Sequence, residues 1–89
     1  MSLTGIAARA GVTTSNLQQL IAHGSATAGF AGRLGVTTSN VNDFINGSAS
    51  AGIANALGTT TSSAQELRNL IGREGAIGLV IGLACGRGG

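Results

Sequence analysis

The chain repeats one short pattern three times: an Ala, a Gly four residues later, a run of polar Thr, Ser and Asn, and then apolar residues. The copies begin at Ile6, Phe30 and Ile53, so the offsets between them are 24 and 23 residues. A repeat of this length is typical of one supersecondary unit that is used several times. It constrains the architecture of the chain more than any other feature.

Each copy opens with a short Ala-rich segment that we expect to be a helix. Ala and Leu favour helix, and the apolar residues recur at helical spacing. A glycine follows each segment, and Gly in this place can adopt the left-handed conformation that satisfies the last carbonyls of a helix. The segments span about residues 3–10, 26–34 and 50–57, and the glycines are Gly11, Gly35 and Gly58.

A second helix is predicted after each of these glycines. Thr-Thr-Ser is a natural N-cap, since a hydroxyl can accept hydrogen bonds from the free amides of a helix start. Ser15 with Gln18 has capping-box spacing, and so does Ser63 with Glu66. The second helices are expected over about residues 15–22, 39–46 and 62–71. We therefore predict one all-α domain of three two-helix units, at about 3–23, 26–46 and 50–71, followed by an apolar C-terminal helix.

The spacing of small and apolar residues within each copy carries a resemblance. The positions are Ala7, Gly11, Leu17 and Leu20; Ala31, Gly35, Val41 and Phe44; and Ala54, Gly58, Ala64 and Leu67. The Ala lets two helices approach closely, the Gly makes a tight turn, and the later residues bury the second helix against the first. In this the pattern resembles the helix-turn-helix of lambda-type phage repressors, over about residues 3–71 and only as short units.

The resemblance implies that the second helix of a copy enters the major groove of DNA with polar side chains at its start. The candidate nucleic-acid contacts are Arg9, Thr13, Asn16 and Gln19 in the first copy, and Arg33, Thr37 and Asn40 in the second. The charge argues against this function. The net charge is only +2, charged residues make up 9% of the chain, and Asp43 would face phosphate. Proteins that bind phosphate backbones usually carry more Lys and Arg on one face, so nucleic-acid binding is the alternative function.

The C-terminal segment, about residues 75–86, is apolar and places glycines four residues apart. On a helix these glycines share one face, and there two backbones can approach closely. Three interpretations stay open: the segment is the last helix of the core, it pairs with a neighbouring copy, or it dips into a membrane, for which about 11 residues are short. The candidate residues for self-association are Ile77, Gly78, Val80, Ile81, Gly82 and Gly86.

Catalytic and metal chemistry finds little support in the composition. His23 and Cys85 are the only residues of their kinds, and no Cys/His pair has the spacing of a metal site. A lone His at a helix end is expected to cap the helix, and a Cys among apolar residues is expected to be unreactive. We therefore expect no enzyme, no metal and no cofactor.

Self-association is the means of stabilisation that the composition leaves open. The chain has 16 glycines, two Phe as its only aromatic residues and one cysteine, so no internal disulfide can form; small domains with so little core usually need such help. We expect a helical repeat module that forms a homo-oligomer or binds a protein partner in an assembly role. No targeting segment is evident and no run reaches the roughly 18 apolar residues of a membrane helix, so the cytoplasm is the default expectation.

Overall fold

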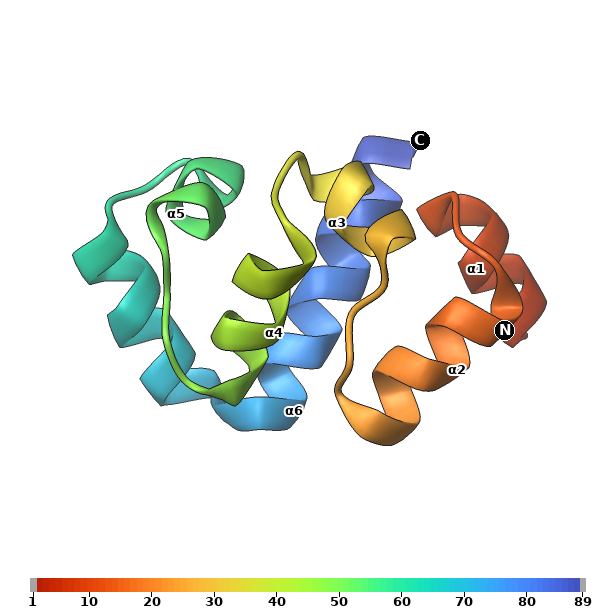
Figure 1. Ribbon diagram of the computed structural model, residues 1–89, viewed down its shortest axis with the longest axis horizontal. Helices are drawn as coiled ribbons and strands as arrows, with labels where there is room; N and C mark the ends of the chain where they lie inside the picture. The colour runs from red at the N-terminus through yellow and green to blue at the C-terminus, as the bar shows by residue number, and fades with distance from the viewer. Residues whose placement is uncertain (1, 89) are drawn as a thin grey trace.

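The computed structural model describes residues 2–88, with the side chains of residues 2–86. All regular structure in this part of the chain is helical, which confirms the predicted all-α class. The helices are α1 (Leu3–Ala10), α2 (Thr14–His23), α3 (Ala28–Leu34), α4 (Thr38–Asn46), α5 (Ala51–Leu57) and α6 (Thr61–Gly88). They form a row about 34 Å long. Unit 1 (α1 and α2) lies at one end of the row, unit 2 (α3 and α4) in the middle, and unit 3 (α5 and the start of α6) at the other end (Figure 1).

Each unit turns between its two helices on a glycine in the left-handed conformation. Gly11, Gly35 and Gly58 have φ angles of 73°, 72° and 73°. Their amides donate to carbonyls in the last turn of the preceding helix, as Gly11 does to Ala8 at 3.2 Å. An L side chain is strained in this conformation, so the recurring glycine is a requirement of the recurring turn.

The N-caps of the second helices lie within the predicted Thr-Thr-Ser runs, at the first Thr of each run. They are Thr13, Thr37 and Thr60, whose hydroxyls accept from the amides three residues on at 3.0, 3.1 and 3.1 Å. The predicted capping boxes at Ser15 and Ser63 are therefore wrong, because both serines already lie inside the first helical turn. The chain needs only one residue after the glycine before it reaches the extended conformation of an N-cap, with φ −80° and ψ 156° at Thr13.

The other helix boundaries lie within two residues of the predicted ones, apart from one join. The helices expected at 62–71 and 75–86 are continuous as α6, except at Gly72, which has φ 72° and ψ −176°. Residues 61–71 complete unit 3, and residues 73–88 turn back across the other units. Only glycine populates this region of backbone conformation readily, so Gly72 makes the bend.

The second part of α6 is the central helix of the core. It packs against α1, α3 and α4 and passes behind the row of units (Figure 1). The side chains that it buries are Ala76, Ile77, Val80 and Ala84. Of the three interpretations of the tail, the core helix is the one that this fold contains. Ile77 and Val80, two of the candidates for self-association, are taken up by this packing.

Two glycines of α3 provide a matched test of the turn. Gly35 and Gly32 are both exposed, with open space where a Cβ would lie, but only Gly35 has a positive φ. We predict that Gly35→Ala lowers the free energy of unfolding by about 1 kcal/mol, because Ala resists the left-handed region. Gly32→Ala is expected to raise it by about 0.5–1 kcal/mol through helix propensity. Urea denaturation measures both, and shifts of the same sign would contradict the assigned turn.

Candidate interaction surfaces

Arginines join the units by donating to carbonyls at helix ends. The Arg33 Nε atom donates to the Ala10 carbonyl at 2.9 Å, where α1 of the preceding unit ends. Arg68, which is only 9% exposed, donates to the carbonyls of Phe44 and Ile45 at 2.6 and 2.7 Å, where α4 ends. A cation at this place also complements the negative end of the helix dipole. Each arginine therefore fastens one unit to the end of a helix in the preceding unit.

Glycines make room for the guanidinium groups of Arg33 and of a third arginine, Arg73. Arg73 donates to the His23 carbonyl at 3.1 Å, where α2 ends. A Cβ on Gly24 would collide with the guanidinium of Arg73, and one on Gly11 would collide with that of Arg33. A planar guanidinium with several fixed donors can lie flat over such a glycine, which an ammonium group does less well. Lysine would therefore replace Arg33 or Arg73 poorly at these two places.

Side-chain amides fasten the linkers between the units. Asn42 Oδ1 accepts from the amide of Ala26 at 2.8 Å, and Gln65 Oε1 accepts from the amide of Ala49 at 2.9 Å. Gln65 Nε2 also donates to the Gly47 carbonyl at 2.7 Å. Asn42 and Gln65 occupy the same position of the repeat, so both junctions between units are built alike.

Sequence reasoning missed these contacts, although the sequence contains a signal for them. The residues that it missed are Asn42, Gln65, Arg68 and Arg73. The Arg33 and Arg68 hydrogen bonds span 23 or 24 residues along the chain, which is the length of the repeat. A polar side chain one repeat away from a helix end is thus a candidate to cap it when units stack.

Most residues predicted to contact nucleic acid are engaged within the chain. Thr13 and Thr37 accept hydrogen bonds from backbone amides as N-caps, and Arg33 donates to a backbone carbonyl. Arg9 and Gln19 are exposed. These two side chains are the ones that remain free to reach outward.

The two asparagines of that set lie at the junctions between units. A Cβ built on Gly29 would lie 3.3 Å from Asn16 Nδ2, and one built on Gly52 would lie 2.7 Å from Asn40 Nδ2. Both asparagines are half-buried. Each therefore covers a glycine in the first helix of the following unit, where a base could not reach the whole amide.

The outer side of α6 carries an exposed glycine face, which we define as Gly78, Gly82 and Gly86. All three residues are exposed, and a Cβ on any of them would have no neighbour within 4 Å. At 3.6 residues per turn this face lies opposite the buried Val80 and Ala84. The half-buried side chains beside it are Leu79, Ile81, Leu83 and Cys85. No element of the described chain covers the α6 glycine face.

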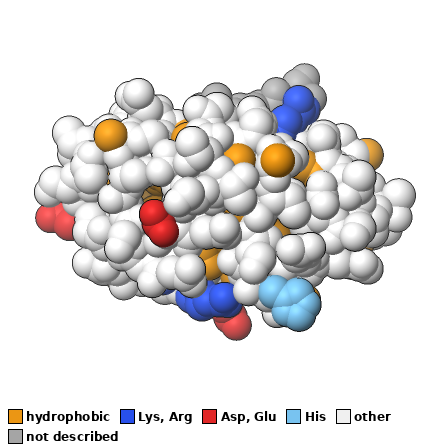
Figure 2. All heavy atoms as spheres, in the orientation of Figure 1, with side chains coloured by type: hydrophobic (Ala, Val, Ile, Leu, Met, Phe, Trp, Pro, Cys, Tyr) orange, Lys and Arg blue, Asp and Glu red, His pale blue; other side chains and the backbone are white. Residues whose placement is uncertain are grey.

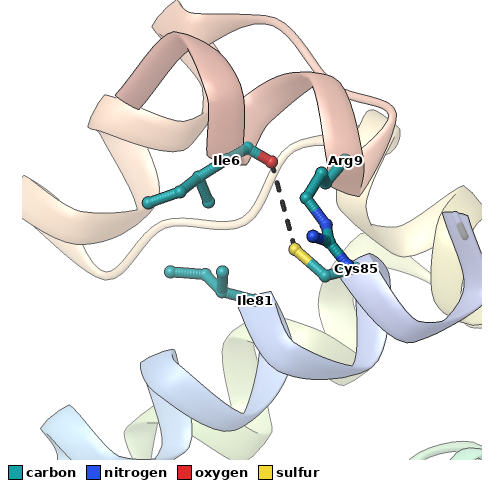
Figure 3. A pocket seen from close by; sticks show the side chains of 4 residues that line it. All are labelled: Ile6, Arg9, Ile81 and Cys85. Atoms are coloured by element: carbon teal, nitrogen blue, oxygen red, sulfur yellow. Dashed lines mark hydrogen bonds between the residues drawn. The ribbon is translucent and has the colours of Figure 1, made fainter. Parts of the chain in front are cut away.

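An open hollow of about 390 Å³ lies between α1 and α6 (Figure 3). Ile6 and Ile81 form apolar walls, Arg9 lies at the rim, and the Cys85 thiol donates to the Ile6 carbonyl at 3.9 Å. One guanidinium and one thiol among aliphatic side chains do not supply a base, a nucleophile and an orienting group together. The hollow therefore has no catalytic constellation.

The surface offers little other chemistry. Figure 2 shows charged side chains as separate spots on the face in view rather than as one patch. Among the described residues, no group of three or more His, Cys, Asp or Glu side chains could hold a metal ion. The remaining surface is dominated by small polar and apolar groups.

No family model, curated protein or solved structure matches this chain.

Removal of Arg68 tests the arginine contacts. We predict that Arg68→Met lowers the free energy of unfolding by about 2–4 kcal/mol, because two carbonyls lose a charged donor in a buried place. Arg9→Met is the matched control, since Arg9 is exposed and makes no hydrogen bond with any residue that the structure describes. Its effect is expected to stay within about 0.5 kcal/mol. Equal losses in urea denaturation would show that Arg68 acts only through its charge or its bulk.

Proposed function

We propose that this chain is a non-enzymatic helical repeat module with a role in assembly, and that copies associate through the α6 glycine face. The observation that supports this proposal is the open space above Gly78, Gly82 and Gly86. A glycine within a helix costs about 0.5–1 kcal/mol relative to Ala, so three of them weaken α6 by roughly 2 kcal/mol. Nothing within the described chain makes use of the missing side chains.

Other glycines of the same chain have a structural role that explains their lack of a side chain. Gly11 and Gly24 admit an arginine, and Gly35 makes a turn. The α6 glycine face does neither, but it would let the backbone of a second helix approach closely, with Leu79 and Ile81 packing at the sides. A second copy of α6 is the simplest partner, since one patch that meets itself gives a two-fold dimer.

The nucleic-acid alternative has less support. It rests on the helix-turn-helix geometry of the units and on Arg9 and Gln19. The asparagines of that set are half-buried at the junctions, and the sparse charge supplies few phosphate contacts.

A role in a membrane also has less support. The span Thr61–Gly86 of α6 has the length and mean hydropathy, 1.2, of a membrane-crossing helix. Core helices of compact helical proteins share these properties, and the bend at Gly72 and the buried Arg68 interrupt the span. We therefore retain assembly as the proposed function.

Sedimentation velocity tests the proposal. We expect the wild-type chain to be oligomeric at tens of micromolar. The double substitution Gly78→Leu with Gly82→Leu is expected to lower the average mass by about half, because a contact between two α6 helices joins copies in pairs. Gly32→Leu is the control, since it adds the same side chain at an exposed helical glycine of α3. A wild-type mass that equals that of the double variant would contradict the proposal.

A titration with duplex DNA separates the alternative. At physiological salt we expect no sequence-dependent complex of sub-micromolar affinity. If the alternative holds, Arg9→Ala weakens binding and lowers the salt dependence by about one phosphate contact. A tight, sequence-dependent complex would reverse the ranking of the two functions.

A further inference from the structure

Large apolar side chains are exposed only in the two end units of the described chain. Leu3 and Ile21 in unit 1 are 39% and 48% exposed, and Leu70 in unit 3 is 84% exposed. Ile45, at the repeat position of Ile21, is fully buried. Arg68 occupies the same position in unit 3 and lies against the unit before it. Ile21 is thus exposed although its counterparts in units 2 and 3 are buried.

Both junctions between units use one arrangement, which has two different sides. A Cβ built on Gly29 would lie 3.4 Å from Val12 Cγ1 of the preceding unit, and one built on Gly52 would lie 3.5 Å from Val36 Cγ1. One side of a junction therefore offers the residue that follows the turn glycine. The other side offers a glycine in the first turn of the first helix of the following unit.

The outer end of unit 1 carries the second side of this arrangement without a partner. Gly5 stands at the repeat position of Gly29, and Arg9 stands at that of Arg33. Both are exposed, and Arg9 makes no hydrogen bond with a described residue. In the first junction, Arg33 uses this position to reach the carbonyl at the end of α1.

The outer end of unit 3 carries the first side. Gly58 stands at the repeat position of Gly11, and Thr59 stands at that of Val12; both are exposed. Gly11 is covered by the guanidinium of Arg33, whereas Gly35 and Gly58 have nothing within 4 Å of their Cβ positions. For Gly35 the reason is that unit 3 has Ala56 at the repeat position of Arg33. The carbonyl of Leu57 corresponds to the Ala10 carbonyl that receives Arg33. The two ends of the molecule therefore carry, by repeat position, the two sides of the first junction, in which Arg33 reaches the end of α1.

We propose that unit 1 of one copy stacks on unit 3 of a second copy of this chain, as unit 2 stacks on unit 1. Arg9 then lies over Gly58 and donates to the Leu57 carbonyl. Such a head-to-tail contact joins unlike surfaces, so it continues into a chain of copies or closes as a ring. Repeat proteins avoid this when their end units have polar outer faces. The contact goes beyond the proposed function, because it uses no residue of the α6 glycine face.

Cysteine cross-linking tests the contact and its polarity. Gly5→Cys and Thr59→Cys are introduced separately and together, in a Cys85→Ser background, and treated with oxidised glutathione. At the internal junctions a Cβ built on the corresponding glycine lies 3.4 or 3.5 Å from the valine Cγ1, a close approach of the kind that a disulfide needs. We expect a mixture of the two single variants to give cross-linked dimers on a non-reducing gel, and the double variant to give a ladder. The ends lie too far apart, along an axis of about 34 Å, to be linked within one copy.

Two controls make the outcome specific. In the first, Gly5→Cys mixed with Gly32→Cys is expected to give no dimer, since Gly32 lies in the middle unit. In the second, Arg9→Ala is expected to weaken the ladder about tenfold, because it removes a charged hydrogen bond. A ladder that persists with Gly78→Leu and Gly82→Leu separates this contact from α6 pairing. No cross-link at tens of micromolar between variants with wild-type circular dichroism, or a Gly5→Cys variant that links to itself as readily, would overturn the proposal.

Discussion

The architecture depends on satisfying the ends of very short helices. Helices α1 to α5 contain 8, 10, 7, 9 and 7 residues. Every helix leaves about four amides and four carbonyls without an internal partner, so in helices of this length about half of the backbone groups are end groups. The stability of these helices therefore depends on their caps. Threonine and serine hydroxyls accept hydrogen bonds from the free amides, and left-handed glycines and arginine side chains donate to the free carbonyls.

The caps also organise the molecule above the level of one helix. Arg33 and Arg68 cap a helix of the preceding unit, so the same hydrogen bonds that complete a helix end also hold two units together. The second part of α6 then supplies the apolar surface that short Ala-rich helices lack. It closes the core around Phe30 and Phe44, the only aromatic residues, both of which belong to unit 2. The middle unit thus exposes no large apolar side chain, whereas Leu3, Ile21 and Leu70 are exposed in the end units.

Much of this fold could be predicted from the sequence, because the decisive signals are local. A glycine in the left-handed conformation ends a helix whatever surrounds it, so the turns at Gly11, Gly35 and Gly58 and the helix boundaries could be predicted closely. The Thr-Thr-Ser runs were predicted correctly as N-caps, but the capping boxes at Ser15 and Ser63 were misplaced by two or three residues because such a run offers several equivalent caps. Backbone geometry after the turn, rather than residue type, selects Thr13, Thr37 and Thr60.

The remaining features depend on tertiary structure. Which face of α6 enters the core follows from the bend at Gly72 and from the packing of three other helices, and neither has a local signal. Ile77 and Val80 could therefore be predicted as apolar, but not as core residues rather than interface residues. The contacts that asparagine and arginine side chains make with a neighbouring unit likewise arise only when the units stack. For this reason, Asn16, Arg33 and Asn40, which were predicted to contact nucleic acid, lie at the junctions between units.

Amide hydrogen exchange at two protein concentrations tests the claim of self-association most directly. The α6 contact and the end contact both predict slower exchange at tens of micromolar than at nanomolar concentration. The slowing should fall in peptides that cover residues 75–86, the start of α1 at Gly5 and the turn at Gly58, while peptides from α4 in the middle unit stay unchanged. Exchange that is independent of concentration in every peptide would contradict the account, since it would show that the exposed glycines and the uncovered end units face only water.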